Sequence, residues 1–166
     1  MKRLAMVITS GLFLLTLATP ALAASTTTFR AVIHEDFGRR ASSEPCFAVG
    51  DDFACPGSGT VQGYGQVTSV ILFPSDGSAL VRTLTFGDGS TLITNETGLT
   101  FTRLPGKAYL APGAAVSYGN PGFDHFAWVI VGGTGRFAGA TGSGEWLNVL
   151  AGDTIVIKFS GVLTLP

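Results

Sequence analysis

Residues 129–142 constrain the fold more than any other part of this chain. They read VIVGGTGRFAGATG, an apolar run followed by a glycine-rich corner and a second glycine-rich stretch. Glycine adopts a positive φ without a steric penalty, so such a corner lets one strand turn sharply into the next. A dinucleotide-binding loop needs a different glycine spacing and a following helix, whose N-terminus holds the pyrophosphate. The segment therefore predicts a turn or bulge between two β-strands.

The rest of the chain has the pattern of an all-β protein. Apolar residues alternate or form short runs between glycine, proline and aspartate, and no stretch after residue 23 keeps a helical period. Glycine makes up 23 of 166 residues, about twice its usual share, which suits strongly bent strands. Strands are predicted over 26–37, 62–73, 79–86, 90–95, 98–103, 123–131, 138–150 and 154–163. Because closure removes exposed sheet edges, we predict a single eight-stranded antiparallel β-barrel, with a β-sandwich as the alternative.

The first 23 residues are predicted to be an export signal. Lys2 and Arg3 precede an apolar run, and the Ala-Leu-Ala at 21–23 fits a signal-peptidase site. The run is shorter than the roughly 20 apolar residues that a membrane anchor needs. Cleavage would leave residues 24–166 as one barrel domain, secreted or periplasmic and without a membrane span. Removing Lys2 and Arg3 leaves 8 basic and 11 acidic residues with no basic cluster, so no nucleic-acid partner is expected.

Cys46 and Cys55 are the two cysteines of the chain, and we predict that they form a disulfide. An oxidising compartment favours the bridge. A redox or metal pair fits less well, because the spacing is not CxxC and no histidine lies between them. His34 and Asp36 share one face of a predicted strand but would need His125 from a distant strand to hold a metal. No metal and no other cofactor is therefore expected.

Residues 132–142, GGTGRFAGATG, resemble the corresponding segment of the dirigent and allene oxide cyclase barrels. These residues resemble even more closely the bacterial secreted proteins that are grouped with those barrels. Supporting stretches are GYG at 63–65, FGDGS at 86–90 and KFSGVLT at 158–164. The resemblance covers most of the chain after residue 23 and implies an eight-stranded antiparallel barrel with a central cavity. It also implies a homo-oligomer, a dimer or trimer.

Five polar residues on or at the ends of predicted strands are candidates for contacting a ligand inside the barrel. Barrel mouths hold apolar ligands, and a few placed polar groups fix their orientation. Arg82 is the strongest candidate because it shares a strand face with Leu84 and Phe86, although an outward arginine over a partly apolar exterior is the alternative. The candidates are Tyr64, Arg82, Arg103, Asp124 and Glu145.

Three functions fit such a barrel. The first is binding of a small apolar or phenolic ligand without turnover. The second is a cavity isomerase or cyclase resembling allene oxide cyclase, which would use an acid and a tyrosine or arginine. The third is a structural or protein-interaction barrel filled by its own side chains. An eight-stranded barrel is just wide enough to be filled or to hold one ligand, so the sequence identifies no catalytic residue and leaves enzyme activity open.

Overall fold

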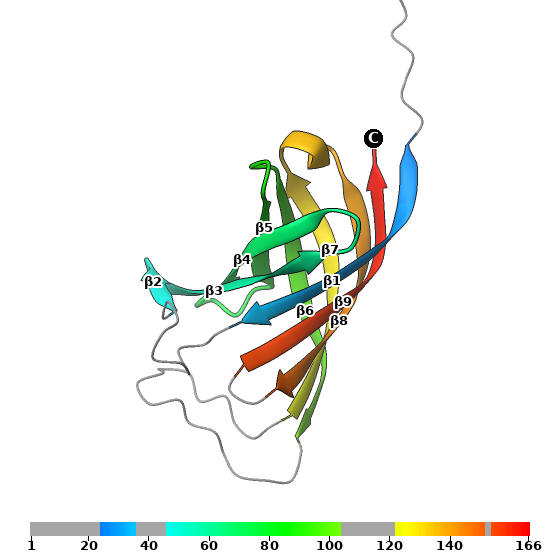
Figure 1. Cartoon of the computed structure of the whole chain (residues 1–166). Coiled ribbons are helices and arrows are strands. Elements are labelled where there is room, and N and C mark those ends of the chain that lie inside the picture. The colour runs from blue at the N-terminus through cyan, green and yellow to red at the C-terminus, as the bar shows by residue number, and fades with distance from the viewer. Residues whose placement is uncertain (1–23, 36–45, 104–121, 152–153) are drawn as a thin grey trace, which may run out of the picture.

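One antiparallel sheet closes on itself to form the fold (Figure 1). The computed structural model describes residues 24–35, 46–103, 122–151 and 154–166. The sheet order is β1-β9-β8-β7-β6-β5-β4-β3-β2, and β1 also pairs with β3. The elements are β1 (Ser25–Glu35), β2 (Phe47–Val49), β3 (Asp52–Val61), β4 (Gly65–Phe73), β5 (Leu80–Phe86), β6 (Thr91–Arg103), β7 (Gly122–Gly133), the 3-10 turn η1 (Gly135–Phe137), β8 (Thr141–Ala151) and β9 (Thr154–Leu165).

Strand β1 closes the barrel. It pairs with β9 from Ser25 to Glu35, and its second half also pairs with β3, from Ala31 opposite Val61 to Glu35 opposite Gly57. Eight strands therefore form a continuous ring, to which the short β2 is added at the edge of β3. The predicted eight-stranded antiparallel barrel is confirmed, and the ring of pairings excludes the β-sandwich alternative.

The predicted export signal lies outside the described residues, as does nearly all of the 104–122 stretch between β6 and β7. Within the described ranges, η1 is the one helical element and has three residues. No helix in these ranges is long and apolar enough to cross a membrane.

The predicted number of eight strands matches the ring, to which β2 is added as an unpredicted ninth, but two assignments within the ring are wrong. β3 is absent from the predicted strands, whereas the predicted strands 90–95 and 98–103 are one continuous strand, β6. The register of β6 against β7 shifts between Gly98 and Thr100. A local irregularity inside a strand, rather than its end, therefore explains the glycine at position 98.

Gly57 and Gly59 allow β1 and β3 to approach each other where the barrel closes. A Cβ on Gly59 would lie 2.8 Å from the Cα of Ile33, and a Cβ on Gly57 would lie 2.9 Å from the carbonyl oxygen of His34. These distances are shorter than backbone atoms tolerate, so neither position accepts a larger residue without a shift of the chain. The β3 sequence lacks a strand-like apolar alternation partly because these inner positions are glycine.

Aromatic side chains fill one end of the barrel interior. Trp128 on β7 is almost fully buried, and its ring centre lies 5.2 Å from that of Phe29. Its indole lies over Gly144 and Gly161, where an added Cβ would come within 2.8 Å and 2.5 Å of Trp128 Cζ2. The glycines on β8 and β9 therefore make room for the largest side chain of the core.

The glycine-rich corner predicted from the sequence is confirmed as the connection between β7 and β8. Gly135 and Gly139 have φ values of +58° and +75°, which glycine adopts without strain. Between them, η1 places the guanidinium of Arg136 over a cluster of aromatic rings. Its Cζ lies 4.9 to 5.4 Å from the ring centres of Tyr64, Phe86 and Phe137.

Asp88, in the turn between β5 and β6, anchors the same end of the barrel. The backbone N–H of Ser90 donates to Asp88 Oδ1 at 3.0 Å, and Arg136 Nε lies 3.4 Å from Asp88 Oδ2. The Ser90 hydrogen bond, assisted by the positive charge of Arg136, lowers the pKa of the Asp88 carboxyl below its ordinary value. Turns and packed rings thus close this end of the barrel.

The predicted disulfide between Cys46 and Cys55 is present. It spans nine positions and ties the chain before β2 to the buried middle of β3. We expect the Cys46→Ser/Cys55→Ser double variant to unfold with a free energy lower by about 2–3 kcal/mol, because the unfolded chain loses its cross-link. Urea unfolding of the oxidised protein and the variant measures this difference. Equal midpoints and slopes would contradict it.

Candidate functional site

Three charged side chains are buried inside the barrel, and we call them the interior charge cluster. Glu35 ends β1, Arg82 lies near the start of β5, and Glu96 lies in the middle of β6. Each is at most 1% exposed. All three point inward because they follow the alternation of core residues along their strands.

Arg82 connects the interior charge cluster across the barrel. Its Nε donates to Glu96 Oε1 at 2.7 Å and its Nη2 to Glu96 Oε2 at 3.2 Å, a bidentate pair. Its Nη1 donates to Glu35 Oε1 and, at 3.1 Å, to Ser69 Oγ. In the ring of eight strands, β1 and β6 lie four steps apart in either direction. One guanidinium therefore joins carboxyl groups from opposite walls.

The two carboxyl groups differ in how completely they are hydrogen-bonded. Glu96 also accepts hydrogen bonds from Thr94 Oγ1 at 3.0 Å and from the indole Nε1 of Trp146 at 2.9 Å. Glu35 Oε2 is buried and has no hydrogen-bond partner among the described residues. Leaving such an atom unpaired costs about 1–3 kcal/mol or more. Glu35 Oε2 is thus the atom of the cluster that can accept a further hydrogen bond.

The charges of the interior charge cluster do not balance. Two carboxylates against one guanidinium give a net charge of −1 when all three groups are ionised. Burying an uncompensated charge is costly, so the cluster favours a hydrogen-bond donor or a cation at Glu35. Gly57 gives this side chain its space, since a Cβ there would lie 3.0 Å from Glu35 Cγ.

Aromatic rings form an apolar wall beside the interior charge cluster. Arg82 Cζ lies 5.3 Å from the ring centre of Phe159 and 6.0 Å from that of Trp146. Phe126 stacks on Trp146 with ring centres 4.2 Å apart and planes 5° apart. Because Phe126 is only partly buried, this stacked pair extends from the cluster toward more exposed positions.

The interior charge cluster lies toward the end of the barrel opposite the Arg136 turn. β1 runs away from that turn and ends at Glu35, and β5 runs toward it after starting two residues before Arg82. The partly buried apolar residues packed against this part of the core are Phe53, Phe73, Leu80 and Phe126.

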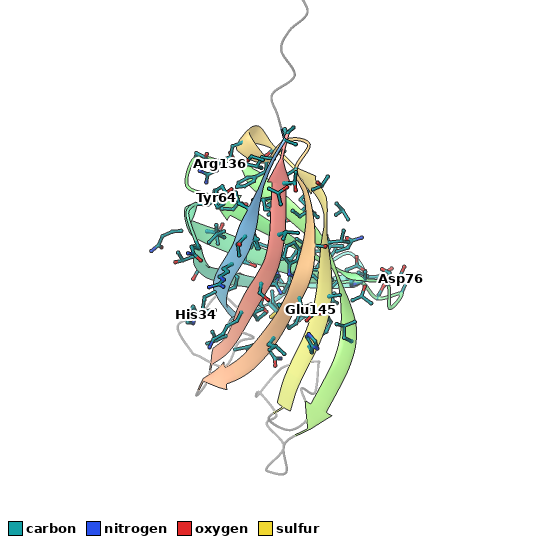
Figure 2. The ribbon with its side chains drawn as sticks, turned by 90° about the vertical axis from the view of Figure 1, so that its right-hand side faces the viewer. His34, Tyr64, Asp76, Arg136 and Glu145 are labelled. Atoms are coloured by element: carbon teal, nitrogen blue, oxygen red, sulfur yellow. A yellow bond between two sulfur atoms is a disulfide. The ribbon has the colours of Figure 1, made fainter. Side chains whose placement is uncertain are left out.

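The five sequence candidates do not form one site. Tyr64 lies beside Arg136 at the closed end, and Glu145 lies on the outer surface far from both (Figure 2). Glu145 points away from the interior. Its Oε2 lies 2.8 Å from His125 Nε2, within hydrogen-bond distance. Glu145 directly precedes the inward-facing Trp146 on β8, so its side chain lies on the opposite, outer face of the strand. The expectation that Glu145 faces a cavity is therefore wrong.

Of the three candidates whose side chains the structure describes, Arg82 is the one that is fully buried inside the barrel, and the outward alternative for it is wrong. The backbones of Arg103 and Asp124 lie near the paired ends of β6 and β7, while their side chains lie outside the described part of the structure. Sequence reasoning missed Glu35 and Glu96. Glu35 lies on the inward face of the strand predicted over 26–37, and Glu96 is one step of alternation beyond the strand predicted over 90–95.

Metal-ligating residues do not gather in the described ranges. No group of three or more histidine, cysteine, aspartate or glutamate residues is close enough there to hold an ion. His34 lies on the outer face of β1, and His125 on β7 contacts Glu145 on the neighbouring β8.

Exposed apolar side chains gather on the outer face of four neighbouring strands, β7, β8, β9 and β1. A surface of this kind favours contact with another molecule when the residues form a continuous patch. The homo-oligomer that the family resemblance implies stays a prediction. The residues are Val32, Val129, Val131, Leu147 and Val162.

No protein-family model matches this chain, and no curated protein matches it. The solved structures that match include the pterocarpan synthase dirigent protein GePTS1, with 15% sequence identity and a TM-score of 0.47. The match covers 89% of this chain and 94% of that chain. At this identity and TM-score we draw no inference from the likeness about ligand or activity, and the barrel fold rests on the strand pairings given above.

Proposed function

We propose that this protein is exported and binds one small, largely apolar molecule inside its barrel without converting it. The observation that carries the proposal is Glu35 Oε2, a buried carboxyl oxygen without a partner in the described residues. A bound molecule with a hydroxyl or amine group would supply the missing donor. Ligand pockets commonly combine apolar walls with a few such polar groups.

The chemistry around Glu35 limits the class of ligand. Four of the five N–H groups of Arg82 are used by Glu35, Ser69 and Glu96, so little positive charge remains for an anionic ligand. The excess carboxylate favours a donor instead. The stacked rings of Phe126 and Trp146 offer a flat apolar surface beside it. A neutral phenol, with an aromatic body and one O–H donor, fits these three features best.

A cavity isomerase or cyclase is the second candidate function. A buried carboxyl group can give a proton to a bound substrate or take one from it, and Glu35 is such a group. The allene oxide cyclase side of the sequence resemblance belongs to this candidate. Product analysis after incubation with a bound ligand separates it from binding alone.

The test uses 4-methylphenol and its methyl ether, which have nearly the same shape but differ in the O–H donor. Native mass spectrometry of the purified protein first identifies any molecule that co-purifies. Tryptophan fluorescence then follows titration with each compound, since Trp146 lies at the site. We expect the phenol to bind about tenfold or more tightly than the ether, the ratio for one hydrogen bond to a charged acceptor.

The Glu35→Gln variant is expected to lose this preference. Arg82 holds the Oε1 side of residue 35, so the new amide group would direct its N–H donors to the position of Oε2. Glu145→Gln, which removes an exposed carboxylate from the outer face, is the matched control and keeps the preference. Equal binding of phenol and ether by the natural protein, or no binding of either, would refute the proposed function.

The proposed export is tested separately from ligand binding, by the intact mass of the protein. We expect the intact mass of the protein recovered from outside the cytoplasm to match residues 24–166 with the two cysteines oxidised. Recovery of the full 166-residue chain from the cytoplasm would contradict export but would leave ligand binding to be judged by the titration.

A further inference from the structure

A pocket of about 500 Å³ lies on the outside of the barrel, between the first half of β1 and the turn that joins β3 to β4. None of its residues belongs to the interior charge cluster, so it is a separate place on the molecule. It is lined by Thr27, Thr28, Arg30, Gln62, Gly63 and Tyr64.

The pocket exists because β1 is longer than the strand against which it closes. β3 pairs with β1 up to Val61 opposite Ala31 and then turns into β4. The last bond across the seam runs from the Gln62 N–H to the carbonyl oxygen of Arg30 at 2.9 Å. Beyond it, β1 continues to Ser25 beside β9, past the turn between β3 and β4 (Figure 1).

This part of β1 has an unpaired edge. Alternate residues of a strand direct their backbone N–H and C=O groups to the same side. Because the Arg30 carbonyl points toward β3, the backbone groups of Thr28 and Thr26 point to that side as well, beyond the end of β3. No backbone hydrogen bond from the turn at 62–64 reaches them in the described residues. Such an edge is a template for another strand.

Within the described residues this edge carries no proline, lysine or bulge, three of the features that usually prevent pairing with another chain. Proteins protect free edges with proline, lysine, bulges or a covering loop. Residues 25–29 read STTTF, with neither proline nor lysine, and the pairing of this segment with β9 runs without a register shift. The threonines at 26–28 are exposed and β-branched, which suits an extended conformation.

Arg30 gives the pocket a free positive charge. It is exposed on the outer face of β1, and the ion pairs of the described residues do not include it. Arg136, near the other wall, is already paired with Asp88 and donates to the carbonyl oxygen of Tyr64 at 3.3 Å. That bond fixes the turn, so the pocket has one rigid wall and one unpaired cation.

We infer that an extended peptide segment with an acidic side chain binds along Thr26–Arg30 as an added strand. It would run antiparallel to β1, in continuation of β3, with its backbone bonded to Thr26 and Thr28 and its carboxylate against Arg30. Added strands gain affinity from main-chain bonds and specificity from alternate side chains. A second copy of this barrel fits less well. Its own unpaired edge, the first part of β1, is paired on its other side with β9, and that strand would collide with the turn at 62–64.

Amide hydrogen exchange of the purified protein tests this inference with two synthetic peptides, acetyl-TVEVT-amide and acetyl-TVKVT-amide. The glutamate peptide is expected to slow exchange at Thr26 and Thr28 by at least fivefold at saturation. The lysine peptide is expected to bind more weakly by up to about fivefold, the upper end for one exposed ion pair.

Four variants separate edge pairing from side-chain contact. Thr28→Pro removes the N–H donor at the free edge and is expected to abolish protection, whereas Thr28→Val keeps the backbone and is expected to keep it. Arg30→Glu is expected to reverse the preference between the two peptides. Asp76→Lys, a charge reversal in the exposed turn between β4 and β5 and away from Tyr64 (Figure 2), is expected to leave it unchanged.

Three results would overturn the inference. The first is no protection of Thr26 and Thr28 by either peptide. The second is unchanged peptide binding in folded Thr28→Pro, which would indicate contact through side chains alone. The third is protection that grows with protein concentration in the absence of peptide, together with a dimer in sedimentation, which would assign the edge to a second copy.

Discussion

The Arg82→Met variant is expected to lose about 3–5 kcal/mol of unfolding free energy, the cost of leaving buried charges without their partner. Arg82 is fully buried and bonded to both Glu35 and Glu96. Without it, two carboxyl groups on opposite walls face each other across an apolar interior. Urea unfolding at neutral pH, followed by tryptophan fluorescence, measures the loss.

The charge argument predicts a rescue that a packing argument does not. Combining Arg82→Met with Glu35→Gln and Glu96→Gln removes all the charge of the cluster, and buried ion groups replaced together are often nearly neutral in stability. The triple variant is therefore expected to be more stable than Arg82→Met alone. Lys158→Met, on the exposed face of β9, is the matched control and is expected to change stability by less than about 0.5 kcal/mol. An additive loss in the triple variant would show that Arg82 acts through packing.

The interior charge cluster could be predicted only in part, because its members are distant in the sequence. Alternation along β5 places Arg82 on the same face as Leu84 and Phe86, and alternation along β1 places Glu35 with Ile33. Neither pattern states that the two side chains meet. That contact depends on the closure of the ring, which brings together residues 47 positions apart. Alternation along the sequence predicts which face of a strand a residue occupies. Which residues of different strands meet in the site depends on how the barrel closes.

Strand β3, against which β1 closes the barrel, also could not be predicted from local sequence patterns. β3 has glycines at 57 and 59 where an ordinary strand would have inward apolar residues, and Pro56 lies between the parts of β3 that pair with β2 and with β1. These residues suggest a loop when read locally. In the barrel the two glycines are required by the close approach of β1. The residues that make closure possible are therefore the ones that weaken the strand pattern.

The second large effect is expected at Gly161 on β9. A Cβ at this position would lie 2.5 Å from Trp128 Cζ2 and 2.8 Å from Gly144 Cα, and it would also collide with the carbonyl oxygen of Ser143. Two of these contacts are backbone atoms of β8, which cannot move without breaking the β8–β9 ladder. We expect Gly161→Ala to lower the unfolding free energy by about 3 kcal/mol, at the upper end for overpacked cores.

Gly87→Ala is the matched control for this prediction. Gly87 lies in the exposed turn after β5, its φ is not positive, and an added Cβ there would meet nothing within 4 Å. Alanine at this site is expected to be neutral or to stabilise by about 0.4–1 kcal/mol, because it restricts the unfolded chain. Trp128 provides an independent readout, since its emission should change in Gly161→Ala and not in Gly87→Ala. Equal stability of the two variants would mean that β8 and β9 can separate at low cost, and the close contact of these strands would then not be what holds Trp128 in the core.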